Sequence, residues 1–164
     1  MISFEDVLRL MNQHEVRFIL IGGWAGIIHG VARSTNDVDL VYSREAGNIS
    51  RLVTALQTWS PYLRGAPPGL PFRWDEATVR SGLNFTLTTT HGDLDLLGEV
   101  TGGGTYEQLL PYTVEATSYG LNFRVVTLEK LIQLKRAAGR PKDLENVAQL
   151  QSLLEERNRP KPGS

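Results

Sequence analysis

The chain has 164 residues, which suits a single domain with enough length to bury a hydrophobic core. Apolar residues make up 41% and charged residues 21%, as in an ordinary globular protein, and no apolar run is long enough to span a membrane. The absence of cysteine excludes disulfides and thiolate zinc sites. A net charge of −1 argues against broad electrostatic binding to nucleic acid, although it does not exclude a local basic patch.

The N-terminal segment has none of the features of a targeting sequence. Met1 leads directly to the polar stretch Ser3-Phe4-Glu5-Asp6, without a basic region followed by an apolar one. We therefore expect no signal peptide and a cytoplasmic location.

The first part of the chain alternates between helical and extended patterns. Apolar residues from Phe4 to Met11 recur at helical spacing, and a dense β-branched run follows. These patterns predict, in chain order, a helix capped by Ser3, a strand at 16–21, a short helix at 24–29, a strand at 37–42 and a helix at 45–59.

The rest of the chain starts with a region rich in proline and glycine, at 60–71, which we expect to be a loop. Then follow strands at 83–90 and 93–97, a flexible loop at 101–105, hairpin strands at 113–118 and 121–127, and helices at 128–138 and 141–157. The prediction is one α/β (α+β) domain over 1–157, with helices packed against a mixed sheet and a C-terminal helical pair. A disordered tail is expected at 158–164.

Two acidic strands carry the first candidate site. Alternate side chains of a strand share a face, so Asp37 and Asp39 point the same way, as do Asp93 and Asp95. The apolar neighbours of Asp37 and Asp39 place their strand inside the fold, where bare carboxylates are costly unless a cation or a base neutralises them. This pattern predicts a divalent metal site, most favourably for magnesium. Asp93 and Asp95 compete for the third ligand position, and Asp95 is favoured because it lies deeper in the apolar run.

Gly22 and Gly23 end the first predicted strand and begin a helix. Backbone N–H groups at such a junction can bind an anion, which favours a cradle for phosphates; the alternative is a plain strand-to-helix turn.

A third group of candidates lies near the C-terminus. Lys135 sits at the edge of the apolar face of its predicted helix and can reach a phosphate; the alternative is a solvated basic helix end. Asp143 lies in the first turn of the last helix, where a carboxylate is favourable in any case. Three histidines, His14, His29 and His91, share no ligand spacing and are expected to be structural.

The run GGWAGIIHGVARSTNDVDLVYS resembles the first motif of the polymerase-β-like nucleotidyltransferase superfamily, in which Gly-Gly or Gly-Ser precedes a helix and Asp-x-Asp. GDLDLLGEV resembles the strand that supplies the third carboxylate. VVTLEKLIQLKRAAGRPKDLENVAQLQ resembles the C-terminal region of small prokaryotic members, among them relatives of AbiEii-type toxins. The resemblance extends from about Val16 to about Leu150. Many members have Gly-Ser where this chain has Gly-Gly, so a contact from that serine is absent.

The resemblance implies a nucleotidyltransferase fold and specific roles for these residues. Asp37, Asp39 and Asp95 would hold two magnesium ions, and Asp95 would help to orient the attacking hydroxyl. Gly22 and Gly23 would contact the β- and γ-phosphates of a nucleoside triphosphate. The remaining candidates are Arg33 and Thr35, which either stabilise the acidic strand or contact phosphate, and Lys135, Arg140 and Asp143, which would act on or position the substrate.

The resemblance also implies a function, namely metal-dependent transfer of a nucleoside monophosphate, for instance from ATP, to a hydroxyl. The acceptor would be an RNA end or a partner protein, in a toxin–antitoxin setting, or a small molecule such as an antibiotic. A binding module without catalysis, acting as a partner subunit, is the alternative. The chain lacks the acceptor-binding domain that larger transferases append, which favours completion of the acceptor site by a homodimer or a cognate partner protein.

Overall fold

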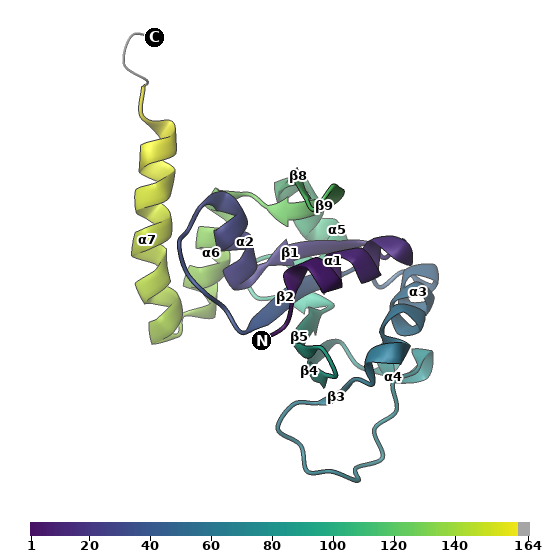
Figure 1. The fold of residues 1–164 in the computed structure, drawn as a ribbon. Coiled ribbons are helices and arrows are strands. Elements are labelled where there is room, and N and C mark those ends of the chain that lie inside the picture. The colour runs from purple at the N-terminus through teal and green to yellow at the C-terminus, as the bar shows by residue number, and fades with distance from the viewer. Residues whose placement is uncertain (161–164) are drawn as a thin grey trace.

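The computed structural model describes residues 1–160, which form a mixed sheet with helices around it (Figure 1). The strands are β1 (Phe18–Ile21), β2 (Asp37–Tyr42), β3 (Tyr62–Leu63), β4 (Asn84–Thr89), β5 (Gly92–Leu97), β6 (Glu99–Val100), β7 (Gly104–Thr105), β8 (Thr113–Ser118) and β9 (Leu121–Val126). The helices are α1 (Phe4–Gln13), α2 (Gly22–His29), α3 (Ala46–Leu56), α4 (Glu76–Ser81), α5 (Tyr106–Leu109), α6 (Leu128–Ala138) and α7 (Pro141–Asn158), with short 3₁₀ turns at Gln57–Trp59 and Leu110–Tyr112.

The main sheet has seven strands in the order β3-β4-β5-β2-β1-β9-β8. β1 runs antiparallel to β2 and parallel to β9, while β2 runs parallel to β5. Parallel pairing joins segments that are distant in sequence and needs a crossover connection. Between β2 and β5 this crossover contains α3, β3, α4 and β4.

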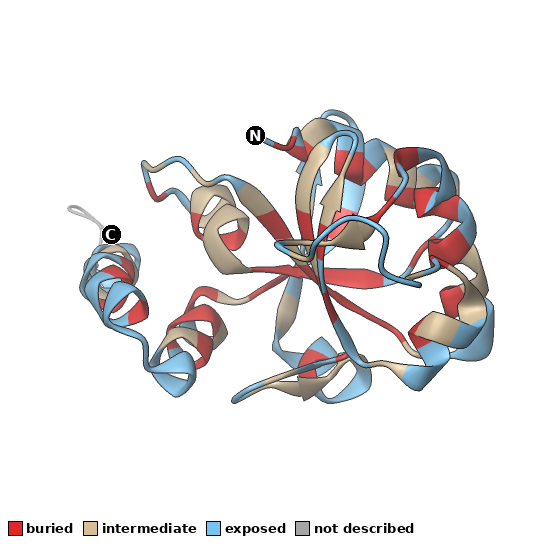
Figure 2. Ribbon diagram, turned by 90° about the horizontal axis from the view of Figure 1, so that it is seen from below, coloured by how far each residue is buried: buried red, intermediate tan, exposed pale blue. Residues whose placement is uncertain are grey.

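The central strands lie within the hydrophobic core, as the red segments at the centre of Figure 2 show, and helices such as α1 and α3 complete it. All four residues of β1 are buried, and so are Val38 and Leu40 of β2. Ser3 caps α1 by accepting a hydrogen bond from the backbone N–H of Asp6 at 3.2 Å, and the buried side of that helix faces this core. Phe4 of α1 stacks on Trp24 of α2 at 4.8 Å between ring centroids, so the two helices are in contact through these rings.

The C-terminal helices α6 and α7 pack against each other, and α7 stands at the margin of the domain (Figure 1). Val147 and Leu150 are its buried apolar residues. Near its end Arg157 Nη2 donates to the backbone carbonyl of His29 at 3.0 Å, which ties α7 to the end of α2. The His29 ring donates from Nε2 to the carbonyl of Val126 at 2.7 Å.

The predicted mixed sheet, packed helices and C-terminal helical pair are confirmed. Two expected loops contain strands instead. Within 60–71, Tyr62–Leu63 forms β3 and pairs with β4, and the expected flexible loop at 101–105 is the turn and second strand of the β6-β7 hairpin. Strands of two residues are too short to produce an alternating pattern, so they could not be predicted from periodicity.

The predicted helix at 45–59 is α3 followed by a 3₁₀ turn. Of the expected tail at 158–164, Asn158 still belongs to α7, and residues 161–164 lie outside the described residues. Within residues 1–160, no helix is long and apolar enough to cross a bilayer.

Candidate active site

Four aspartates line one face of the two central strands. The parallel register places Asp37 opposite Asp93 and Asp39 opposite Asp95. Carboxylate oxygens of Asp37, Asp39 and Asp95 all lie within 4.8 Å of one another. Asp95, rather than Asp93, therefore joins the β2 pair, as the sequence favoured.

The electrostatics of this cluster centre on Asp39. Burial raises the pKa of Asp39 to about 8, with further contributions from a hydrogen bond to Asp95 and from the negative charges of Asp37 and Asp95. The positive charge of Lys135 opposes this pKa shift in part. At neutral pH and without a cation, Asp39 consequently stays protonated.

The carboxylate cluster fits a divalent cation. Mg²⁺ holds oxygen ligands at about 2.1 Å, so neighbouring ligands of one ion lie about 3 Å apart and opposite ligands about 4 Å apart. The oxygens of Asp37, Asp39 and Asp95 need only small side-chain rotations to reach these separations. Hard carboxylate oxygens are also the donor type that Mg²⁺ prefers.

Gly22 begins α2 directly against the carboxylates. It has φ of +72°, and a Cβ at this position would collide with Oδ2 of Asp39. A side chain is therefore excluded by both backbone conformation and space. At Gly23 a Cβ would lie 3.0 Å from Oγ1 of Thr35, which is tight. No side chain caps the start of α2, so its first N–H groups remain available beside the acidic face.

The two residues before the acidic strand make supporting contacts. Thr35 Oγ1 donates to Oδ1 of Asp37 at 3.3 Å, which helps to orient that carboxylate. Arg33 Nη2 donates to Oδ1 of Asn146 at 2.7 Å, so it links the loop before β2 to α7. These contacts favour the stabilising role for both residues, although both also line the cavity described below.

A second charged group, made of Lys135, Asp143 and Arg140, lines the same cavity as the aspartates. In it one carboxylate pairs with two basic side chains. Asp143, whose side chain is only 3% exposed, accepts from Arg140 Nε at 2.6 Å and meets Lys135 Nζ at 3.8 Å. Arg140 holds the pKa of Asp143 below its ordinary value by this hydrogen bond, which outweighs the opposing effect of burial. Burial lowers the pKa of Lys135, and the charge of Asp143 opposes this change. Asp143 therefore fixes Lys135 in place, within electrostatic range of Asp39.

Arg64, which the sequence did not single out, lies on the same acidic face. Its guanidinium is 2.8 Å from Asp95 Oδ1, 3.3 Å from Asp93 Oδ2 and 4.0 Å from Asp37 Oδ2. Arg64 directly follows β3, in the region predicted to be a loop. A single arginine between glycines and prolines carries no recognisable motif, so nothing in the sequence pointed to it.

One cavity of about 630 Å³ collects all ten residues that the sequence proposed for the site. These are Gly22, Gly23, Arg33, Thr35, Asp37, Asp39, Asp95, Lys135, Arg140 and Asp143. Both signs of charge line it, with carboxylates on the sheet side and basic groups from α6 and α7. A volume of this order suits a nucleotide-sized ligand.

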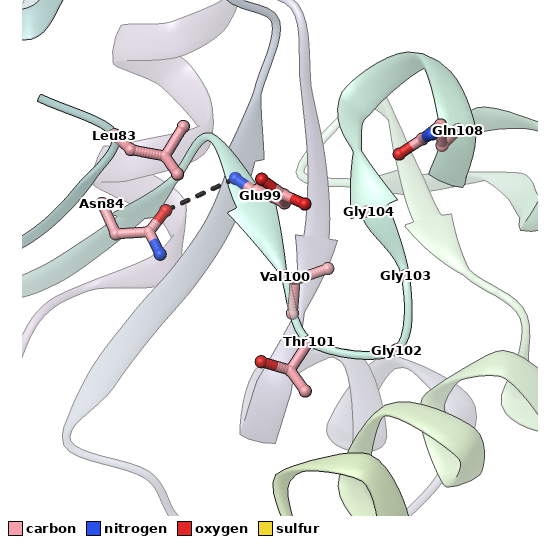
Figure 3. A pocket seen from close by; sticks show the side chains of 9 residues that line it. All are labelled: Leu83, Asn84, Glu99, Val100, Thr101, Gly102, Gly103, Gly104 and Gln108. Atoms are coloured by element: carbon pink, nitrogen blue, oxygen red, sulfur yellow. Dashed lines mark hydrogen bonds between the residues drawn. The ribbon is translucent and has the colours of Figure 1, made fainter.

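A second cavity of about 580 Å³ adjoins the first at the β6-β7 hairpin (Figure 3). The two cavities share four residues, Asn84, Glu99, Val100 and Thr101. Asn84 accepts at Oδ1 from the backbone N–H of Gly98 at 2.9 Å and of Glu99 at 3.4 Å, which fixes the shared wall.

The chain matches no protein-family model, and no curated protein matches it in sequence. Solved structures do share its architecture. The lincosamide antibiotic adenylyltransferase LnuA, with lincomycin bound, has 15% identity and a TM-score of 0.62, over 93% of this chain and 98% of that chain. ANT(2")-Ia in complex with adenylyl-2"-tobramycin has 16% identity and a TM-score of 0.56, over 93% of this chain and 88% of that chain. An antigenic nucleotidyltransferase-like protein from Paracoccidioides brasiliensis has 15% identity and a TM-score of 0.56, over 96% and 76%.

At these identities the likeness concerns the fold, because one fold can host unrelated functions. The matches to LnuA and ANT(2")-Ia extend over nearly all of this chain and include the mixed sheet and the C-terminal helices. The chain therefore has the nucleotidyltransferase fold that its motifs predicted.

Proposed function

We propose that the chain is a metal-dependent nucleotidyltransferase. The observation that carries the proposal is the convergence of Asp37, Asp39 and Asp95 within 4.8 Å, on a fold shared with nucleotidyltransferases. Three carboxylates beside the start of a helix and a half-buried lysine would provide both a metal site and a phosphate site. A catalytically silent subunit would have no need to keep this costly cluster of charges.

The reaction that fits the site is attack by a hydroxyl oxygen of an acceptor on the α-phosphorus of a nucleoside triphosphate. A bond forms between that oxygen and the α-phosphorus, and the hydroxyl gives up its proton to the Asp95 carboxylate or to water. The bond between the α-phosphorus and the β-phosphate oxygen breaks, and pyrophosphate leaves. Asp37, Asp39 and Asp95 would hold magnesium ions, whose charge activates the hydroxyl and offsets charge on the phosphates when bound. Asp95 would orient the attacking hydroxyl.

The triphosphate would lie between the start of α2 and the basic group of α6 and α7. Gly22 and Gly23 offer backbone N–H groups with no side chain in the way. Lys135 provides a positive charge that Asp143 holds in place. Arg140 also pairs with Asp143, and its side chain is 73% exposed, so it would present its outer N–H groups to the outer phosphates.

Among acceptors, we favour a small hydroxyl-bearing molecule. The second cavity has a volume typical of small-molecule sites, shares its wall with the first, and presents Asn84 and Glu99 as polar groups. Two structural neighbours, LnuA and ANT(2")-Ia, hold lincomycin and adenylyl-2"-tobramycin, respectively. An RNA end or a partner protein, as the resemblance to AbiEii-type toxins implies, is the alternative, and the net charge of −1 speaks against RNA.

The test offers each labelled nucleoside triphosphate, with Mg²⁺, to three acceptor pools: small hydroxyl compounds including aminoglycosides and lincosamides, total RNA, and whole-cell protein. We expect label in the small-molecule pool, and no transfer by Asp39→Asn. Label in RNA or protein would contradict a small-molecule acceptor but would still support nucleotidyl transfer as the activity. Absence of label from all pools, with no release of pyrophosphate, would contradict the proposed activity.

A further inference from the structure

Arg64 bridges the carboxylates of the acidic face. Its Nη2 lies 2.8 Å from Asp95 Oδ1, its Nε 3.3 Å from Asp93 Oδ2 and its Nη1 4.0 Å from Asp37 Oδ2. The side chain is 27% exposed, so these ion pairs are partly shielded from water.

The sheet holds Arg64 through both its backbone and its guanidinium group. Its backbone N–H donates to the carbonyl of Thr86 at 3.0 Å, which extends the pairing of β3 with β4 by one residue. Its Nη2 donates to the carbonyl of Leu87 at 2.7 Å as well as to Asp95. The side chain thus crosses β4 from the edge strand to reach β5, in a position that the backbone defines.

The position of Arg64 explains why Asp93 and Asp95, the two aspartates of β5, differ in their interactions. Asp93 faces Asp37 in the register, yet it does not belong to the group of carboxylates that can hold a metal ion. Its Oδ2 meets the guanidinium of Arg64, which neutralises it locally. Asp95 takes part in both interactions. Its Oδ1 accepts a hydrogen bond from Arg64, and its carboxylate is also one of the three that could hold a metal ion.

A guanidinium this close to two of the three metal ligands must also act on the metal. Arginine keeps its charge at every accessible pH, so its repulsion of an incoming cation is permanent. For a divalent ion about 5 Å away in a water-accessible site, the repulsion is of the order of a tenfold change in affinity.

We propose that Arg64 is a positioning residue that acts as a built-in counter-ion, stabilising the acidic face without metal and weakening its affinity for divalent cations. This inference rests on the metal site of the proposed function, but not on transfer activity. It predicts that removing the charge of Arg64 destabilises the metal-free protein and at the same time strengthens metal binding. A residue that merely supported the fold would give the first effect without the second.

The experiment measures Mn²⁺ and Mg²⁺ binding by calorimetry without nucleotide, together with melting temperatures in EDTA. The variants are Arg64→Met, Arg64→Gln, which is neutral but keeps a polar side chain, and Arg64→Lys, which keeps the charge. Arg80→Met is the matched control, because Arg80 is an exposed arginine whose ion pair with Glu76 lies on α4. Asp39→Asn serves to establish that the measured binding belongs to the carboxylate cluster.

We expect Arg64→Met and Arg64→Gln to melt several degrees lower in EDTA and to bind divalent cations about tenfold more tightly. Arg64→Lys should bind with nearly wild-type affinity, and Arg80→Met should change neither quantity. If the neutral variants are unfolded in EDTA, the proposal requires that millimolar Mg²⁺ refolds them.

Unchanged or weaker metal binding by the neutral variants, or failure of Mg²⁺ to refold them, would overturn the role of Arg64. In that case metal binding by the wild type that is lost in Asp39→Asn would leave the proposed metal site standing. A wild type that binds no divalent cation would contradict both the metal site and the counter-ion.

Discussion

Replacing Asp39 with asparagine should stabilise the metal-free protein at neutral and alkaline pH. Asp39 has a pKa of about 8 in the folded chain against an ordinary value of 3.8, chiefly because of burial and its hydrogen bond to Asp95. Between these two values the folded state holds a proton that the unfolded chain has released. The stability associated with Asp39 is therefore fully present below about pH 4 and is lost as the pH rises through about 8.

The magnitude follows from the size of the pKa shift. One pKa unit corresponds to about 1.4 kcal/mol, so the whole shift corresponds to at most about 5–6 kcal/mol. The site can relax around the charge of Asp39, so we expect about 2–3 kcal/mol to be realised. Asparagine is close in size to aspartate and remains neutral, so the variant should lose most of this pH dependence.

The assay is urea unfolding in EDTA at pH 5, 7 and 8.5, repeated with Mg²⁺. We expect Asp39→Asn to exceed the wild type in the free energy of unfolding at pH 8.5 and to converge with it toward pH 5. Mg²⁺ should stabilise the wild type by an amount that grows with the logarithm of its concentration above the Kd, and it should leave the variant nearly unchanged. Asp93→Asn is the control, because it removes a carboxylate of the same face whose side chain is 39% exposed and which pairs with Arg64.

The reasoning would be refuted if Asp39→Asn lowered the stability of the metal-free protein at pH 8.5. Equal stabilisation of both proteins by Mg²⁺ would show that the ion binds elsewhere. A similar gain in Asp93→Asn would assign the effect to the general charge of the face rather than to the buried position of Asp39.

Three further substitutions test the other parts of the site. Gly22→Ala should cost about 2 kcal/mol or more in thermal and urea unfolding, because its Cβ meets Asp39 in a left-handed backbone conformation; a cost below about 0.5 kcal/mol would contradict this close approach. Gly23→Val should lower stability, because its side chain meets Thr35, and should weaken nucleotide binding in a calorimetric titration by a larger amount; equal losses would indicate a structural turn only. Lys135→Met should reduce transfer by roughly ten- to a thousandfold with the melting temperature changed by a few degrees, since Arg140 still pairs with Asp143; unchanged transfer kinetics would remove Lys135 from the site.

The sequence predicted the acidic face well because it depends on the simplest periodicity of a strand. Once Asp37 and Asp39 lie in a buried strand, alternation places them on one face, and a second strand with the same spacing only has to pair in register. The prediction of Asp95 rather than Asp93 agrees with the three carboxylates that lie close enough to hold a metal ion. That prediction was based on the deeper position of Asp95 in the apolar run. The structure adds a second reason, namely that Arg64 binds Asp93.

Arg64 itself could not be predicted, because its position depends on tertiary pairing. β3 has only two residues, and it is a strand because β4 pairs with it. The same holds for the β6-β7 hairpin, where Gly102 and Gly103 suggested a loop and the pairing of Glu99 with Thr105 makes the wall of the second cavity. Short elements of this kind have little local preference and take their conformation from their neighbours.

The parallel pairing of β2 with β5 also determines when the acidic cluster exists. The strands are separated in sequence by the whole crossover through α3, β3, α4 and β4, and contacts of long sequence separation carry a high cost of chain closure. In a nascent or partly folded chain Asp39 and Asp95 are therefore far apart, and a lone Asp37–Asp39 pair is a poor chelator. Divalent cations should consequently leave the rate of refolding almost unchanged and slow unfolding instead. Bound metal would therefore stabilise the folded domain kinetically without helping it to fold.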